Sequence, residues 1–385
     1  MIDRPTNEPR LFDALKSLRR ELHRFPELSG QEVETARRVV GWLGTCHPDS
    51  VITGFGGHGV AAIFDGEDPG PTVMLRAELD ALPIIETGQP DHRSLIDGKA
   101  HLCGHDGHTA ILCGLAAMLG EERPAKGRVV LLFQPAEEDG SGAAAVIDDP
   151  RYLEIAPDFA FSIHNMPGVP LGHARIAPGA MNCASRGLRI GLQGRTAHAS
   201  MPETGLSPAP ALAALIPALT ALSRGADVAD AEFRLATITH AHLGAPAFGI
   251  APGDAELWVT LRSRDDSGMD GLLIDAQAAI ARHARELTVS LSQHDIFLAC
   301  SNDDEATQIF RKAFEAEGIV HDSSDLPMRA SEDFGRFGLA GTRSAMALLG
   351  SGEIPALHNP DYDFPDALIP VGMRLFRRLV SDILG

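Results

Sequence analysis

The stretch His101-Leu-Cys-Gly-His-Asp-Gly-His108 decides how the rest of this chain is interpreted. Within it one glycine separates Cys103 from His105, so a thiolate and an imidazole can turn toward the same ion. Both are side-chain types that bind zinc and similar divalent cations. Three distant segments carry further side chains of these types: Gln134-Pro-Ala-Glu-Glu138, His164-Asn-Met-Pro167 and Leu357-His-Asn-Pro360. The sequence therefore predicts a metal centre assembled from four parts of the chain.

Short apolar runs precede Asp80 and several of these candidate ligands. Three runs show this arrangement: Thr72–Arg76 before Asp80, Arg128–Phe133 before Glu137 and Glu138, and Phe159–Ile163 before His164. A helical apolar pattern at Thr109–Leu119 lies between the first two runs. Because the sites of open α/β sheets lie beyond the carboxyl ends of buried strands, these runs predict an α/β catalytic domain with a central mixed sheet.

The number of candidate ligands indicates how many ions they bind. Five donors are too many for one tetrahedral catalytic ion that keeps an open position, and they suit two ions that share a bridging group. With 16 histidines in the chain, most are expected to be ordinary surface or core side chains. The predicted ligands are Cys103, His105, Glu138, His164 and His358.

Glu137 and Glu138 follow a fully apolar run and a proline, which places them at a sheet end. Neighbouring carboxylates often lie in a solvated loop, and that alternative stays open. If the backbone is extended here, the two side chains point to opposite sides. Glu138 can then bind metal while Glu137 faces a water whose pKa the metal lowers, acts as general base and hands the proton to the leaving nitrogen.

Length and composition set the wider frame. A chain of 385 residues predicts two domains, and a net charge of −19 argues against a nucleic acid or an anionic membrane as partner. The first residues show no secretory signal, and no apolar run is long enough to span a membrane. Five scattered cysteines indicate reduced thiols and a cytoplasmic location rather than a disulfide framework.

The pattern changes near residue 182. Two strand-and-helix units predict a small antiparallel α+β domain of ferredoxin-like type, from these segments: Arg186–Leu192, Pro208–Leu222, Phe233–Thr239, Ala255–Arg262 and Gly268–Glu286. The last part of the chain must return to the first domain, because it carries His358. We therefore expect a catalytic domain of residues 1–181 and 296–385, with an inserted domain at 182–295.

Eight motifs in order together resemble the N-acyl-amino-acid amidohydrolases, the hippurate hydrolase and auxin-conjugate hydrolase branch of the dimetal aminoacylase/carboxypeptidase family. They are Glu-Leu-His23-Arg-x-Pro26-Glu-Leu-Ser, Arg76-Ala-Glu-Leu-Asp80-Ala-Leu-Pro, His101-x-Cys-Gly-His-Asp106, Gln134-Pro-Ala-Glu-Glu, His164-Asn, His198-Ala-x-x-Pro202, Ser331-Glu-Asp-Phe and Leu357-His-Asn-Pro. The resemblance implies hydrolysis of the amide bond of a small N-acyl amino acid. It also implies two divalent ions, zinc or manganese first and cobalt or nickel next, with Cys103 in the bridging place.

The resemblance assigns further roles residue by residue. Asp80 would orient a ligand, and His198 of the inserted domain would polarise the scissile carbonyl, in such families often in the partner subunit. The inserted domain would act as lid and supply the contact of a homodimer. The candidates for binding the substrate carboxylate or lining its pocket are Arg262, Ser331 and Glu332. In two places the chain departs from the family pattern. It has Glu78 where the family usually has the shorter aspartate, and Gly249 where the family usually has an asparagine.

Three other functional classes could use some of the same residues. A dipeptidase or carboxypeptidase, or an N-acetyl-diamino-acid deacetylase, would use the same chemistry, and Cys103 in the bridging place favours the acyl-amino-acid branch. A cysteine hydrolase built from Cys103 and His105 is disfavoured, because two residues on one turn are poorly placed to pair as nucleophile and base. A non-catalytic binding protein would be expected to lack the base, yet Glu137 is present with every expected ligand.

Overall fold

The computed structural model describes residues 8–385, which divide into two compact units. Unit 1 comprises residues 8–181, Ser301–Asp325 and Asp333–Gly385, and unit 2 comprises Asn182–Cys300 and Leu326–Glu332. Each unit has its own cluster of buried apolar side chains. None of the described helices combines the length and the apolar character that a bilayer crossing requires.

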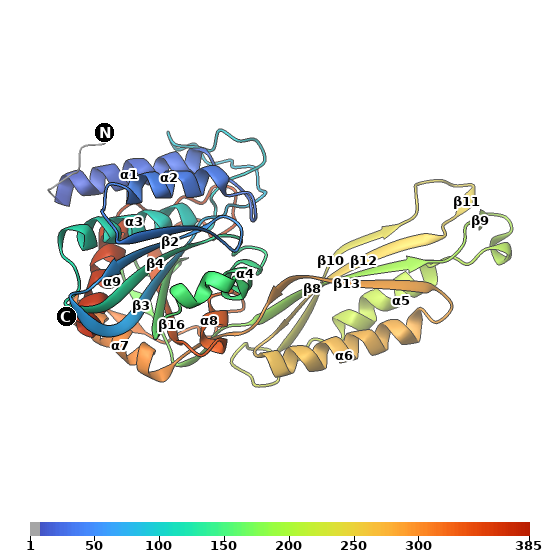
Figure 1. The fold of residues 1–385 in the computed structure, drawn as a ribbon. Helices are drawn as coiled ribbons and strands as arrows, with labels where there is room; N and C mark the ends of the chain where they lie inside the picture. The colour runs from blue at the N-terminus through green and yellow to red at the C-terminus, as the bar shows by residue number, and fades with distance from the viewer. Residues whose placement is uncertain (1–7) are drawn as a thin grey trace. The chain divides into compact units, whose positions relative to one another are not determined.

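Unit 1 is built on an eight-stranded mixed sheet (Figure 1). In spatial order its strands are β1 (Ser50–Phe55), β2 (Gly59–Asp65), β4 (Lys126–Gln134), β3 (Asp68–Glu78), β5 (Phe159–Pro167), β16 (Arg343–Gly352), β6 (Ala174–Arg175) and β15 (His321–Asp322). The four central strands β4, β3, β5 and β16 are mutually parallel. The predicted α/β class with a central mixed sheet is confirmed.

Helices cover both faces of this sheet. One face carries α2 (Val33–Leu43), α3 (His105–Glu121), α7 (Asp304–Ala316) and α9 (Leu368–Leu384), with α1 (Glu8–Arg24) packed on α3. Two short helices, α4 (Gly142–Asp148) and α8 (Gly335–Leu339), contact β4 and β16 and each other. Val73, Leu75 and Ala77 alternate along β3 and are fully buried in the main core, as a strand between helical layers requires.

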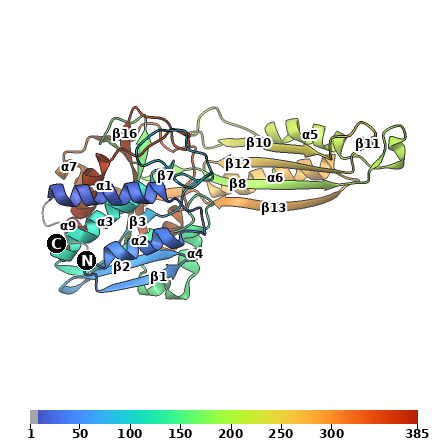
Figure 2. The ribbon, with the colours of Figure 1, turned by 90° about the horizontal axis from the view of Figure 1, so that it is seen from above.

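Unit 2 is an antiparallel sheet with two helices on one face, the α+β arrangement that the sequence predicts (Figure 2). Its strands in spatial order are β10 (Arg234–Leu243), β12 (Asp254–Ser263), β8 (Ala184–Gln193) and β13 (Thr288–Phe297), and its helices are α5 (Ala209–Thr220) and α6 (Asp266–His283). Sequence analysis missed β13. This strand lies at the sheet edge and is mostly exposed, so it lacks the regular apolar alternation that marks a half-buried strand.

The helix after the Cys-Gly-His stretch begins at His105, four residues earlier than the apolar pattern predicts. Gly104 precedes it with φ 97°, a left-handed conformation that favours glycine. A Cβ atom at Gly104 would lie 2.0 Å from Asn165 Oδ1. The glycine therefore allows both the turn out of Cys103 and the close approach of β5, and His105 enters the site from the first turn of α3.

Replacing Gly104 with alanine should lower the free energy of unfolding by more than about 2 kcal/mol, because a strained φ costs roughly 1–3 kcal/mol and the clash with Asn165 adds to it. Gly98→Ala is the matched control, since Gly98 has φ 73° and its Cβ would meet nothing within 4 Å. Calorimetric melting of both variants tests this. Equal losses in the two variants would show that the contact with Asn165 contributes nothing.

Candidate active site

Parallel strand pairing in unit 1 brings the predicted ligands to one edge of the sheet. Asp80 follows the end of β3, Glu137 and Glu138 follow β4, and His164 lies near the end of β5. The loop after β16 returns to this edge, where the backbone N–H of His358 donates to the Leu102 carbonyl at 2.8 Å. Because parallel strands end at the same edge, residues more than 250 positions apart meet here.

The five predicted ligands lie in overlapping groups with a shared thiol. Ligand atoms of Cys103, His105 and His164 lie within 4.8 Å of one another, and so do those of Cys103, Glu138 and His358. Cys103 Sγ is 3.4 Å from His164 Nε2, and Glu138 Oε2 is 3.6 Å from His358 Nε2. Cys103 belongs to both groups, as a ligand that bridges two cations must.

Hydrogen bonds fix which ring nitrogen faces the site. His105 Nδ1 lies 2.9 Å from the Asp80 carbonyl oxygen and 3.3 Å from its carboxylate, so this nitrogen carries the proton and donates. His105 Nε2 is buried and has no hydrogen-bond partner among the described residues. His164 Nδ1 likewise donates to the Asn165 carbonyl at 2.8 Å. In neutral rings both Nε2 lone pairs then point to the site, the orientation in which an outer carboxylate or carbonyl prepares a histidine for metal.

His108 is excluded from the ligand set by the same reasoning. Its ring lies 4.8 Å from that of His164, yet its Nε2 accepts the Asn165 N–H at 3.1 Å and its Nδ1 donates to Glu78 at 2.7 Å. Both nitrogens are used. Glu78 therefore orients His108.

The charges of the site favour cations. Burial, followed by the charges of Glu138 and Glu137, raises the pKa of the Cys103 thiol well above its usual range. Burial alone would lower the pKa of His105, but the hydrogen bond to Asp80 and the nearby carboxylates of Glu78 and Glu138 outweigh it and raise this pKa to about 10. Burial and the nearby carboxylates hold the proton on Cys103, hydrogen bonding and the nearby carboxylates hold it on His105, and divalent ions would replace both protons.

The local conformation of Glu137 and Glu138 differs from the expectation. Both lie in a turn rather than on extended backbone, because β4 ends at Gln134, Pro135 has no N–H to continue the ladder, and Ala136 has φ 50°. The alternation argument from the sequence is therefore wrong. The turn nevertheless brings both carboxylates to His105 Nε2, Glu137 at 3.9 Å and Glu138 at 3.8 Å.

The remaining predicted site residues lie in unit 2. The exposed ring of His198, in the short strand β9 (Ala197–His198), accepts at Nδ1 the backbone N–H of Ser200 at 3.2 Å. Arg262 Nη1 donates to Ser331 Oγ at 2.9 Å and to the Arg329 carbonyl at 2.8 Å, and burial lowers its pKa. Glu332 is buried in the chain beside Ser331. Within this unit the structure thus brings Arg262 and Ser331 together.

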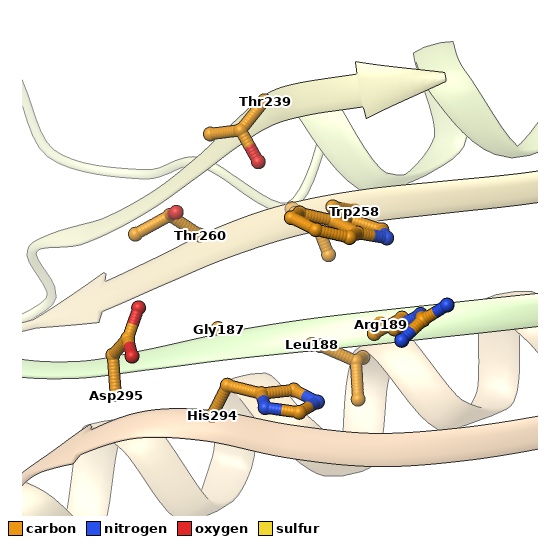
Figure 3. A pocket seen from close by; sticks show the side chains of 9 residues that line it. Gly187, Leu188, Arg189, Thr239, Trp258, Thr260, His294 and Asp295 are labelled. Carbon is orange, nitrogen blue, oxygen red and sulfur yellow. The ribbon is translucent and has the colours of Figure 1, made fainter. Parts of the chain in front are cut away.

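Unit 2 also has a hollow of about 240 Å³ on the outer face of its sheet. Figure 3 shows the indole of Trp258 beside the guanidinium of Arg189, which lies 5.5 Å from the ring centre. His294 and Asp295 lie on the neighbouring strand. None of the site residues predicted from the sequence lines this hollow.

Sequence reasoning missed buried charged residues that hold the site together. Arg76 of β3 donates to Gln134 at 3.0 Å and pairs with Asp333 at 2.7 Å, and it also pairs with Glu78. Glu32, fully buried, accepts the backbone N–H of Ala136 at 2.8 Å. Arg76 could have been found from the sequence, because a charged residue inside an apolar strand is unusual. The sequence around Glu32 gives no comparable signal.

Comparison with known proteins identifies the family. The profile described as Peptidase family M20/M25/M40 matches residues 74–382. The chain is 29% identical to the IAA-amino acid hydrolase ILR1-like 5 of Arabidopsis thaliana, over 97% of this chain and 87% of that protein. It is 32% identical to the N-acetyl-L-cysteine deacetylase of Bacillus subtilis, over 95% and 87% respectively.

Among solved structures, the fold is similar to that of the Bacillus subtilis YXEP protein, described as a dinuclear metal binding peptidase from the M20 family. The TM-score is 0.78 at 24% identity, and the match covers 98% of this chain and 99% of that one. This likeness supports the fold. The profile match over residues 74–382 and the sequence identities over 97% and 95% of the chain show that the chain belongs to peptidase family M20/M25/M40 and is a hydrolase of amide bonds.

Proposed function

We propose that this enzyme hydrolyses the amide bond of N-acyl amino acids with the help of two divalent cations. One observation carries the proposal. A thiol shared by two groups of ligand atoms lies at the same sheet edge as a carboxylate, Glu137, whose Oε2 is 3.9 Å from a ligand imidazole. The relatives support the substrate class, since one is named for amino acid conjugates of IAA and another for an N-acetylated amino acid.

The chemistry of the donors fits a pair of cations. Cys103, His105, Glu138, His164 and His358 would hold them, and the buried, unpartnered Nε2 of His105 is the atom that most needs one. Mixed thiolate, imidazole and carboxylate donors suit zinc or manganese, with cobalt or nickel as further candidates. Bound cations of this kind lower the pKa of water and polarise a carbonyl oxygen. Asp80 would keep His105 in the ligating tautomer.

Glu137 is the proposed general base. It is 5% exposed, so it can exchange a proton with a substrate while lying mostly out of solvent. It would take the proton of the attacking water and later give it to the leaving nitrogen, which becomes the amino group of the released amino acid. Both transfers use one carboxylate, and the proton balance closes without a second acid.

Glu137→Gln should lower kcat by about 10²–10⁴-fold, the usual range for a general base, and keep two metal ions per chain. Steady-state kinetics together with metal analysis by mass spectrometry measure both quantities. Asp139→Asn is the control, because Asp139 is an exposed acid of the same turn, and its kcat should stay near that of the parent. Turnover by Glu137→Gln within a factor of a few of the parent would remove the base assignment.

The substrate class follows less directly from the residues. Arg262 has a backbone carbonyl and the Ser331 hydroxyl as hydrogen-bond partners, so its charge suits the carboxylate of an amino acid. Glu332, the next residue after Ser331, is a further candidate for lining the pocket. The named deacetylase relative also supports an N-acetyl-amino-acid deacetylase, and a dipeptidase or carboxypeptidase of the same chemistry is the other alternative. Comparing kcat/KM for N-acetyl-, N-benzoyl- and indoleacetyl-amino acids with that for dipeptides separates these classes.

Metal uptake should release protons. Without metal, the raised pKa values of Cys103 and His105 keep both groups protonated at pH 7, while metal binding needs the thiolate and the neutral ring. Affinity should therefore rise with pH, and about two protons should leave per chain. Zinc titration calorimetry of the metal-free protein in buffers of different ionisation enthalpy measures this number. Uptake without proton release would contradict the two assignments.

We also propose that two copies of the chain associate through unit 2 and that His198 acts in the partner's active site. The backbone N–H of Ser200 donates to His198 Nδ1, so the neutral ring carries its proton on Nε2 and can donate it to a carbonyl oxygen. His198 is exposed and is free to meet a substrate. The long, exposed edge strand β13 offers main-chain groups to a second copy. A cytoplasmic location, supported by five scattered, buried cysteines, belongs to the same proposal.

Mixing two inactive variants tests this arrangement. In an equal mixture of Glu137→Gln and His198→Ala chains, after subunit exchange, about half of the dimers pair the two variants, and one of their two sites then has both intact side chains. About a quarter of the parent activity should return. Light scattering checks that the mixture is dimeric. Failure to regain activity in an exchanged dimer would mean that His198 does not act in the partner's site.

A further inference from the structure

The segment between α1 and α2 contacts the site without supplying any ligand. It forms an isolated parallel bridge from Leu28 to Ala81, beside Asp80. Ser29 Oγ donates to Asp80 Oδ2 at 2.8 Å, and the same carboxylate oxygen accepts the backbone N–H of Glu138 at 2.9 Å. The segment therefore reaches the loop that carries Glu137 and Glu138 from the side of Asp80.

Glu32, at the end of this segment, holds the other side of that loop. Its Oε1 accepts two backbone N–H groups, from Gly30 at 2.9 Å and from Ala136 at 2.8 Å. The side chain is fully buried, and burial raises the pKa of its carboxyl group. A buried acid is costly to keep, so its contact with Ala136 calls for a reason.

Helix capping does not supply that reason. Glu32 occupies the N-cap position of α2, yet its side chain makes no capping hydrogen bond. Glu27 caps the helix instead, because its Oε2 accepts the Thr35 N–H at 2.8 Å and the Thr35 hydroxyl at 2.9 Å. The Glu32 side chain is thus directed away from its own helix toward the catalytic loop.

The backbone conformation of Ala136 has to be stabilised by its surroundings. Its φ of 50° is uncommon for a residue with a side chain and persists only where the surroundings impose it. The Gly142 N–H donates to the Ala136 carbonyl at 2.8 Å, and a Cβ at Gly142 would lie 1.8 Å from the Pro135 carbonyl oxygen. Ala136 is therefore fixed at both its N–H, by Glu32, and its carbonyl, and the next residue is Glu137.

We propose that Glu32 is a positioning residue for Glu137. By holding the Ala136 amide on one side while Asp80 holds the Glu138 amide on the other, it sets the direction in which the Glu137 carboxylate leaves the turn. Because Glu32 is fully buried, its effect on Glu137 would be indirect, through Ala136. The inference rests on the proposed role of Glu137 as general base.

Three substitutions at Glu32 separate positioning from folding. Glu32→Gln keeps an acceptor oxygen of the same reach, so kcat should stay within about three-fold of the parent. Glu32→Leu removes the acceptor and should lower kcat by about 10–100-fold, with KM nearly unchanged and two metal ions retained, because small misplacements of a catalytic group cost about this much. Glu32→Asp shortens the reach of the carboxylate to Ala136, so its kcat should lie between those of the glutamine and leucine variants. If the leucine variant does not fold, the aspartate variant tests the positioning role in its place.

Glu27→Leu is the matched control, since it removes the cap of α2 without touching the loop. It should lower the melting temperature and leave kcat of the folded enzyme unchanged. If Glu32→Leu behaves like this control, with stability lost and kcat kept, Glu32 is only structural and the inference is overturned. Loss of kcat in Glu32→Gln as large as in Glu32→Leu would also overturn it, because the hydrogen-bond acceptor would not be the feature that matters.

Hydrogen exchange of the peptide covering residues 134–140 tests the contact without reference to catalysis. Exchange should be faster in Glu32→Leu and unchanged in Glu32→Gln. Unchanged exchange in Glu32→Leu would overturn the inference whatever Glu137 does. If exchange accelerates while Glu137→Gln keeps normal turnover, the hold of Glu32 on the loop stands and the base assignment of Glu137 fails, so the two failures are distinguishable.

Discussion

Parallel pairing of β4, β3, β5 and β16 is the constraint on which the site depends. It brings the carboxyl ends of four strands to one edge of the unit 1 sheet, and polar side chains from separate parts of the chain leave the apolar core there. Gly104 adds the turn that starts α3 at the same edge and admits β5 close by. The sheet edge and this turn thus position the proposed metal ligands.

Around the ligands, outer hydrogen bonds decide what each side chain can do. Asp80 and the Asn165 carbonyl turn His105 and His164 so that their Nε2 atoms face the site. Glu78 and the Asn165 amide use both nitrogens of His108, which removes it from the ligand set although it lies within contact of His164. Ligating power here is a property of the hydrogen-bond network and not of the residue type alone.

The proposed base lies under the same kind of control. Glu137 sits in a turn whose backbone groups are fixed by Glu32, Asp80 and Gly142. A turn of this form is less regular than a strand, so fixing its amides is how the fold limits the freedom of the carboxylate. Glu32, Glu78 and Asp80 therefore share one property: each buried carboxylate orders a neighbouring polar group of the site or its surroundings.

The sequence by itself determined the fold class, the ligand types and the order of the motifs. Apolar runs of strand length and helical periodicity are local properties, and the residues after each run identify the sheet edge. It could not determine the turn at Ala136, the edge strand β13, or the exclusion of His108, since each depends on partners distant in the chain. Only the tertiary structure decided that Glu32 meets Ala136 across 104 positions. A hydrogen bond between distant segments leaves no periodic trace, because neither partner's neighbours need to change for it to form.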